Sequence, residues 1–238
     1  MTKNFDKITK KVANMYKKYP YPSPSTEVNQ TNELLNLLRI FELESNIQLK
    51  NKKFLDAGSG SGHRIVNVAQ HYKNCNFLGI DISDTSLKIS QTIKNKNNLK
   101  NIQFKKYNLM NPTFNLGKFD FILSMGVLHH LSNPNKGLEN ILKVLKKDGM
   151  IFVYLYGKLG GHKRILNKKL LSLLLNKKKS DYDLGIKLVR DLDMNKFEYG
   201  WNLNFKNKEE EDSLIVDSLL HANEKLYDFN DIHKLFKN

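Results

Sequence analysis

Residues 54–64 read FLDAGSGSGHR, and this stretch decides the fold. An apolar pair leads into Asp56, and glycines follow at the alternate positions 58, 60 and 62. Glycines in such a turn adopt positive φ and let the backbone approach a ligand closely. The helix expected after the turn offers free N–H groups and a positive dipole end. The stretch therefore predicts a nucleotide-like ligand, held between the end of a buried strand and the start of a helix.

The spacing of the glycines separates phosphate ligands from others. A dinucleotide-binding turn has the pattern G-x-G-x-x-G, whereas this chain has G-x-G-x-G with His63 at the place of the last dinucleotide glycine. Asp56 would repel a pyrophosphate but suits a ligand with an ammonium group. A Walker-type site is excluded because no Gly-Lys-Ser/Thr follows. S-adenosylmethionine (SAM) fits better, because it has no phosphate, a cationic sulfonium and an amino-acid end.

Short apolar segments alternate with polar helical segments from residue 52 onward. Strands are expected at 53–57, 76–80, 102–107, 119–124 and 150–156, with helices at 63–72, 85–94 and 136–146. This alternation predicts an α/β fold, a parallel sheet with helices on both faces. The triplet Lys147-Asp148-Gly149 is typical of a helix end and is expected to separate the last of these helices from the fifth strand.

The order of motifs across residues 53–157 resembles that of class I SAM-dependent methyltransferases. LDAGSGSG resembles their first motif, and FLGID at 77–81 resembles the second. FKKYNL at 104–109 resembles the third motif, and KFDFILS at 118–124 resembles the fourth strand. VLHHL at 127–131 matches the LHHL segment common after that strand, and VLKKDGM at 144–150 is close to the lead-in to strand five. The resemblance implies a Rossmann-like sheet of order 3-2-1-4-5 and a methyltransferase that converts SAM to S-adenosylhomocysteine.

The same resemblance implies which residues bind the cofactor. Asp81 stands where the family has an acid that accepts hydrogen bonds from both ribose hydroxyls. Asn108 stands where the family usually has Asp to accept from the adenine amino group, and its amide oxygen can accept the same bond. The expected cofactor-binding residues are Asp56, Gly58, Ser59, Gly60, Gly62, Asp81, Ile82, Asn108, Leu109, Ser124 and Gly126.

The methyl acceptor is marked less clearly. Enzymes that methylate exocyclic amines of nucleic acid have an Asp/Asn-Pro-Pro-aromatic pattern after strand four, whereas residues 124–127 read SMGV. Cytosine-C5 enzymes need a nucleophilic cysteine there, and Cys75 lies at the wrong end of the sheet. No His/Cys/carboxylate cluster has metal-ligand spacing. His129 and His130 are candidate catalytic bases at the carboxyl edge of the sheet. Packing of His129 beside the cofactor and a bond from His130 to a loop carbonyl are the alternative roles.

Residues outside the motif region are expected to shape the acceptor site. We expect an N-terminal helical lid at 1–48, the SAM-binding core at 49–157 and a helical C-terminal region at 158–238. YKKYPYPSP at 16–24 resembles the lead-in of a subset of these enzymes, in which an N-terminal helix folds over the cofactor; a rigid turn packed on the sheet is the alternative. Residues 155–164 and 217–229 resemble a glycine loop and a tail region of the same subset. The expected lid or substrate contacts are Tyr16, Tyr21 and Tyr156.

No strand pattern is visible after residue 157. We therefore expect the sheet to lack the usual last strands, which leaves an edge for the helical tail, a second copy in a homodimer or a partner chain to cover.

The net charge of +15 comes mostly from lysine, in a chain that is also rich in asparagine. Such usage is typical of an AT-rich genome, whereas dedicated nucleic-acid sites use arginine. A small-molecule acceptor, methylated at an oxygen, nitrogen or carbon atom, is favoured over nucleic acid. An RNA methyltransferase and a SAM-binding subunit that needs a partner are the alternatives. No apolar run reaches the roughly 20 residues of a membrane span, and no secretory signal is visible, so we expect a cytoplasmic protein.

Overall fold

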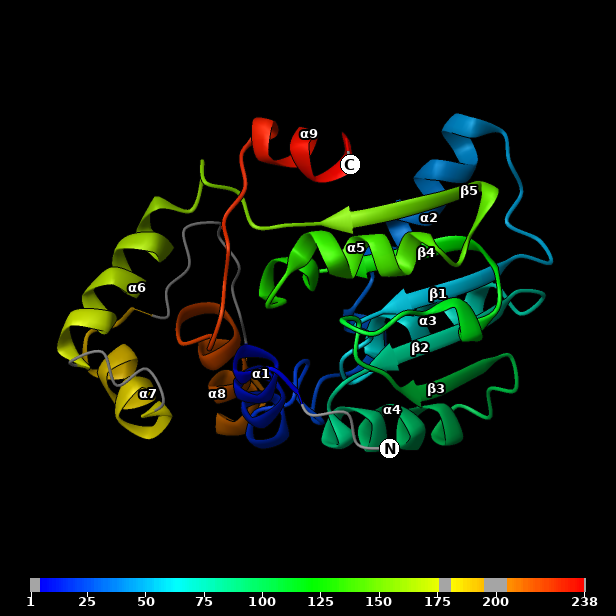
Figure 1. Ribbon diagram of the computed structural model, residues 1–238. Helices are drawn as coiled ribbons and strands as arrows, with labels where there is room; N and C mark the ends of the chain where they lie inside the picture. Colours follow the sequence, from blue (N-terminus) through cyan, green and yellow to red (C-terminus); the bar gives the residue numbers. More distant parts are fainter. Residues whose placement is uncertain (1–4, 176–180, 195–204, 238) are drawn as a thin grey trace.

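A parallel sheet forms the centre of the molecule in the computed structural model, which describes residues 5–175, 181–194 and 205–237 (Figure 1). Within these ranges the sheet has five strands in the order β3-β2-β1-β4-β5. They are β1 (Lys53–Ala57), β2 (Asn76–Asp81), β3 (Ile102–Lys106), β4 (Phe119–Met125) and β5 (Leu145–Tyr154). The predicted Rossmann-like class and strand order are confirmed.

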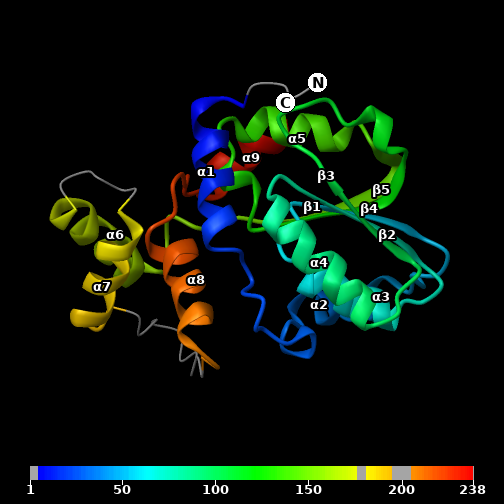
Figure 2. The same ribbon diagram turned by 90° about the horizontal axis from the view of Figure 1, so that it is seen from below.

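Helices cover both faces of the sheet (Figure 2). One face carries α2 (Glu33–Ser45), α3 (His63–His71) and α4 (Asp84–Lys96), and the other carries α5 (Pro134–Leu142) and α9 (Phe229–Lys237). Successive strand residues point to opposite faces, so Phe54 and Leu55 belong to different cores. On the first face the Phe54 ring stacks on Phe77 and Phe121, each with a centroid separation of 4.9 Å.

A further group of helices lies beyond the carboxyl ends of the strands. It consists of α1 (Lys7–Lys18), α6 (His162–Leu174), α7 (Tyr182–Asp191) and α8 (Lys208–Leu219), which we call the cap. The cap has its own apolar core, which includes Met15, Leu171, Val189 and Ile215. Figures 1 and 2 both show α1 beside α8, although the two helices are far apart in the sequence.

The C-terminal region divides between two places. Helices α6 to α8 join α1 in the cap, whereas α9 packs on the sheet beside α5. Between them, the N–H of Tyr227 donates to the Tyr156 carbonyl at 2.9 Å, and the N–H of Lys158 donates to the Tyr227 carbonyl at 2.8 Å. The described part of the chain shows no sixth strand. The tail pairs with the chain beyond the end of β5 through one isolated parallel bridge, between Gly157 and Tyr227.

The helix predicted at 136–146 is present as α5, but its predicted end at Lys147-Asp148-Gly149 was wrong. Helix α5 already ends at Leu142, and the triplet lies within β5, where the pairing with β4 shifts register. A Cβ on Gly149 would lie 3.0 Å from the Asp120 carbonyl oxygen. The glycine therefore permits a close approach of two strands at an irregularity, and does not end a helix.

None of the helices within the described ranges combines the length and apolar character needed to cross a membrane. Cys75 is buried, and its thiol donates to the Leu49 carbonyl at 3.0 Å.

Candidate active site

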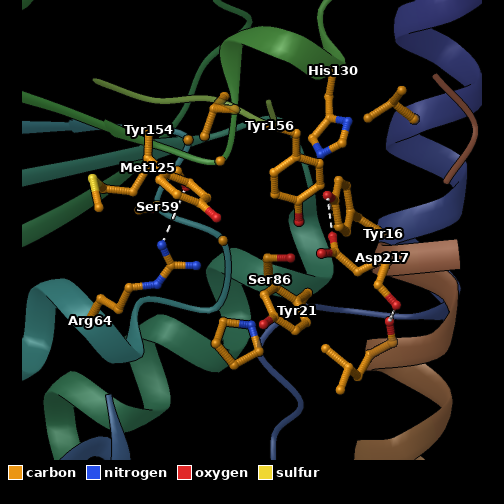
Figure 3. A pocket seen from close by; sticks show the side chains of 18 of the residues that line it. Tyr16, Tyr21, Ser59, Arg64, Ser86, Met125, His130, Tyr154, Tyr156 and Asp217 are labelled. Carbon is orange, nitrogen blue, oxygen red and sulfur yellow. Dashed lines mark hydrogen bonds between the residues drawn. The ribbon is translucent and has the colours of Figure 1, made fainter. Parts of the chain in front are cut away.

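A cavity of about 1260 Å³ separates the carboxyl edge of the sheet from the cap (Figure 3). The glycine turn and the ends of β2 and β4 form one wall, and residues of α1 and α8 form the opposite wall. A pocket for one small ligand typically measures roughly 300–1000 Å³. The cavity therefore has room for two ligands side by side, at the edge where parallel sheets bind them.

The glycine turn has the backbone conformation that its sequence predicts. Gly58, Gly60 and Gly62 have φ values of 96°, 53° and 80°, in the left-handed region that favours glycine. The first two N–H groups of the turn donate to the Ile80 carbonyl at 2.8 and 2.9 Å. The N–H of Gly60 donates to Oδ2 of Asp81 at 2.9 Å. The turn is thus fixed to the end of β2.

The N-terminal segment presses on the other side of the turn. The N–H of Ser61 donates to the carbonyl of Tyr21 at 3.2 Å. A Cβ on Gly60 would lie only 2.5 Å from that carbonyl oxygen. Glycine at position 60 is therefore required by contact as well as by its φ. The contact brings Tyr21, one of the expected lid residues, into the wall of the cavity.

Two carboxyl groups, those of the buried Asp56 and the half-buried Asp81, line the cavity beside the turn. Asp81 accepts from the N–H groups of Gly60 and Ser83, and burial raises its pKa while these bonds oppose the rise. Burial also raises the pKa of Asp56 to about 7, against the effect of the nearby Arg64 guanidinium. Acceptor oxygens with an adjacent cation suit a ligand that presents hydroxyl donors and an amino-acid end.

Most of the predicted cofactor residues line the cavity. Besides the two acids, these are Gly58, Ser59, Gly60, Ile82, Asn108, Leu109 and Gly126. Oδ1 of Asn108 already accepts from the Met110 N–H at 3.0 Å, which leaves it one further lone pair. Two of the predicted residues lie outside the lining. Gly62 is the N-cap of α3. Ser124 is buried in β4, and its hydroxyl has no partner among the described residues.

The two candidate histidines occupy different environments. His129 is fully buried outside the cavity lining, its ring lacks a hydrogen-bond partner among the described residues, and burial lowers its pKa to about 2. His130 lines the cavity, and its Nδ1 lies 2.8 Å from the Asn223 carbonyl. Because a carbonyl only accepts, Nδ1 carries the proton and Nε2 carries a lone pair. Burial lowers the pKa of His130 as well.

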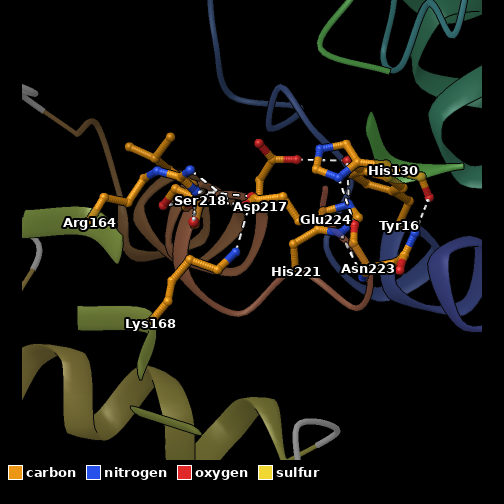
Figure 4. A network of polar contacts seen from close by, with 10 residues as sticks. Tyr16, His130, Arg164, Lys168, Asp217, Ser218, His221, Asn223 and Glu224 are labelled. Atoms are coloured by element: carbon orange, nitrogen blue, oxygen red, sulfur yellow. Dashed lines mark hydrogen bonds and ion pairs between the residues drawn. The ribbon is translucent and has the colours of Figure 1, made fainter. Parts of the chain in front are cut away.

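Tyr16 joins α1 to the end of α8 through a directed chain of hydrogen bonds (Figure 4). The N–H of Asn223 donates to Nδ1 of His221 at 3.0 Å, so the neutral ring carries its proton on Nε2. That nitrogen lies 3.1 Å from the Tyr16 oxygen and donates to it. The Tyr16 hydroxyl then donates to Oδ1 of Asp217 at 2.7 Å. The chain ends on a carboxylate at the cavity wall.

Tyr156 lies next to this chain and also lines the cavity. Its ring packs against His129, with a centroid separation of 4.3 Å, and under the Arg164 guanidinium at 4.6 Å. Arg164 in turn pairs with Glu224 at 3.0 Å. The ring of Tyr156 is therefore held by charged and aromatic neighbours on the cap side.

Sequence reasoning missed three residues of the cavity region. Arg64, next after the turn, donates to the Met125 carbonyl at 3.3 Å. Asp217 and His221 appeared only within the resemblance of the tail, and His221 lies beyond the end of α8, where helical spacing does not relate it to Asp217. His130, Asp217 and His221 also present three potential metal ligands within 4.8 Å, but the hydrogen-bond chain uses both nitrogens of His221. We therefore describe the group as a hydrogen-bonded cluster.

Comparison with known proteins agrees with this geometry. A family described as "Methyltransferase domain" matches residues 48–211. An uncharacterized protein of Rickettsia prowazekii, RP028, is 30% identical over 149 residues, which covers 62% of this chain and 58% of that protein. The ubiquinone biosynthesis O-methyltransferase of Coxiella burnetii is 28% identical over 119 residues, half of each chain. These and other curated relatives are longer, and the chain spans 24% to 58% of their lengths.

A solved structure has a similar fold. PKMT2 of Rickettsia typhi, in complex with AdoHcy, aligns with a TM-score of 0.58 and 24% identity over 80% of this chain and 39% of that chain. At this level of identity the likeness concerns the fold.

Proposed function

The chain belongs to the methyltransferase domain family, and we propose on that basis that it transfers the methyl group of SAM to an oxygen, nitrogen or carbon atom of a small acceptor in the cavity. One observation carries the proposal. The glycine turn with Asp81 and the polar cluster around Tyr16 line opposite walls of the same cavity. A cofactor on one wall would therefore face an acceptor on the other.

The residues of the sheet-edge wall fit the cofactor. Asp81 has lone pairs beyond those used by two N–H groups and would accept from the ribose hydroxyls. Asn108 would accept from the adenine amino group. Asp56 and Arg64 offer opposite charges to the ammonium and carboxylate of the amino-acid end. When bound there, SAM supplies an electrophilic methyl group attached to a sulfonium.

The cap wall would align the acceptor and exclude water. Methyl transfer is an in-line displacement, so catalysis depends chiefly on orientation and on removal of competing solvent. Tyr16 is fixed by its bonds to α8, and Tyr156 is fixed by its packing. Tyr156 and His130 are not cap residues but follow β5 and β4 at the edge of the sheet. His130 presents the unprotonated Nε2 and would accept a hydrogen bond from the acceptor.

A methyl-label screen tests this function. The purified chain is incubated with methyl-labelled SAM and with separate metabolite and RNA fractions of a cell extract. We expect label in the metabolite fraction, and its loss in the Asp81→Asn variant. Label confined to RNA would contradict a small acceptor. SAM binding without label in either fraction would contradict turnover and identify a SAM-binding subunit.

A further inference from the structure

The carboxyl group of Asp217 on the cap wall forms no ion pair among the described residues. Asp217 is 6% exposed and lines the cavity from α8. In the described part of the chain, only its Oδ1 receives a hydrogen bond, from the Tyr16 hydroxyl at 2.7 Å. Figure 3 shows the carboxyl group pointing from α8 toward Tyr16 and Tyr156. One oxygen is therefore available to a ligand.

The His130 ring and the Arg64 guanidinium act to lower the pKa of Asp217, but neither forms an ion pair with it among the described residues. Burial lowers the pKa of both His130 and His221, so both rings are neutral near pH 7. Arg164 and Lys168 each pair with Glu224 at 3.0 Å. The ion pairs within the described ranges do not include Asp217.

A buried carboxylate without a cation is costly, so either the group is protonated or a ligand supplies the positive charge. Burial raises the pKa of Asp217, as expected for such a group.

Aromatic rings line the same part of the cavity. Tyr16, Tyr21 and Tyr156 all belong to its lining, and the rings of His130 and Tyr156 are 5.9 Å apart. Aromatic faces attract ammonium groups through their quadrupole, most strongly where water is excluded. A carboxylate among tyrosine rings is thus complementary to a cation. A neutral hydroxyl compound or a carboxylate would leave the charge of Asp217 unpaired.

We propose that the methyl acceptor is an amine, bound as its ammonium form by Asp217 and the surrounding tyrosines, an inference that rests on the proposed methyl transfer. The ammonium gives a proton to the free oxygen of Asp217, and burial favours the resulting neutral pair. The lone pair of the nitrogen then forms the N–C bond while the C–S bond breaks. The electron pair of that bond stays on sulfur, so a thioether and a methylated ammonium result, and the Asp217 proton passes to solvent.

Titration of the complex with S-adenosylhomocysteine (SAH) tests the acceptor class without knowledge of the natural substrate. The probes are benzylammonium and benzyl alcohol, which have similar shape and differ in charge. We expect calorimetry to show benzylammonium binding at least about tenfold more tightly than benzyl alcohol. In Asp217→Asn the ratio should approach one, while Asp217→Glu should keep part of the preference. Glu209→Gln removes a charge from the same helix outside the cavity lining and should keep all of it.

The other outcomes are equally informative. Equal affinity for the two probes in the wild type, or no binding of benzylammonium, would overturn the amine proposal while SAH binding leaves the methyltransferase proposal intact. A large loss of SAH affinity in Asp217→Asn would also overturn it, because Asp217 would then hold the amino group of the cofactor. Failure of the wild type to bind SAH would instead overturn the proposed function itself. Circular dichroism of each variant confirms that it is folded.

Discussion

The two walls of the cavity are built in different ways. The sheet-edge wall is built from the glycine turn and the ends of neighbouring strands, and the turn of residues 58–62 bonds directly to Ile80 and Asp81. The cap wall is assembled from distant segments, and Tyr16 and Asp217 are 201 residues apart. A ligand held mainly by backbone and strand ends can be identified from a local motif. A ligand held by side chains from several elements depends on how those elements pack, and this packing is what the sequence does not display.

Separate damage to the apolar cores of the cap and of the sheet should have different effects on the cofactor site. Ile215 is fully buried in the cap core, and Ile122 is fully buried in the sheet core. We expect either Ile→Ala change to lower the free energy of unfolding by about 2–5 kcal/mol, measured by urea denaturation. Ile215→Ala should leave SAH affinity nearly unchanged, whereas Ile122→Ala should weaken it. Equal losses of SAH affinity in the two variants would mean that the walls are not independent.

Gly60→Ala should disable the sheet-edge wall. The new Cβ would lie 2.5 Å from the Tyr21 carbonyl oxygen, at a φ of 53°. We expect SAH affinity to fall about 100-fold in calorimetry, through strain and displacement of the turn. Gly117→Ala is the matched control, because its φ is 92° but nothing lies within 4 Å and it is outside the cavity lining. Similar SAH affinities for both variants would contradict the role of the turn.

His63, at the start of α3, should make the stability of the protein depend on pH. Burial lowers the pKa of His63 to about 4 from 6.5. Below pH 6.5 the unfolded chain binds a proton at this ring that the folded chain excludes, so stability falls as the pH falls toward 4. Between pH 7 and 5 the wild type should lose about 2 kcal/mol more than His63→Leu.

Buried acids with raised pKa, such as Asp56, act in the opposite direction, but they act equally in both proteins. Urea denaturation at the two pH values measures the free energy of unfolding of both proteins. Parallel pH profiles would contradict the lowered pKa of His63, because its ring would then bind protons equally in the folded and unfolded chains.

Tyr16→Phe should give the smallest effect, and it tests whether Tyr16 belongs to the acceptor site. It removes the hydroxyl that donates to Asp217. We expect the free energy of unfolding to fall by about 1 kcal/mol. The affinity for benzylammonium should change about fivefold, while the affinity for SAH stays the same. Tyr19→Phe is the control, because its hydroxyl donates to Asp183 outside the cavity lining, at 2.9 Å. An equal effect of both variants on benzylammonium would remove Tyr16 from the site.

The same difference explains what the sequence predicted. The strand at 53–57 and the conformation of the glycine turn were predicted correctly, because a short apolar run and the φ freedom of glycine are local properties. The end of α5 was wrong, because Lys147-Asp148-Gly149 serves equally well at a strand irregularity. The pairing of Tyr16 with Asp217 was out of reach, because it depends on the docking of α1 against α8. Whether the chain divides at residues 48 and 157, as predicted, stays a prediction.

The most direct test of the two-wall arrangement is calorimetric titration of SAH into Asp81→Asn and Asp217→Asn side by side. We predict about a 30-fold loss of SAH affinity for Asp81→Asn, which corresponds to about 2 kcal/mol for charge-assisted bonds, and a change within about threefold for Asp217→Asn. Comparable losses in both variants, or a loss confined to Asp217→Asn, would contradict it, because the cofactor would then lie against the cap wall.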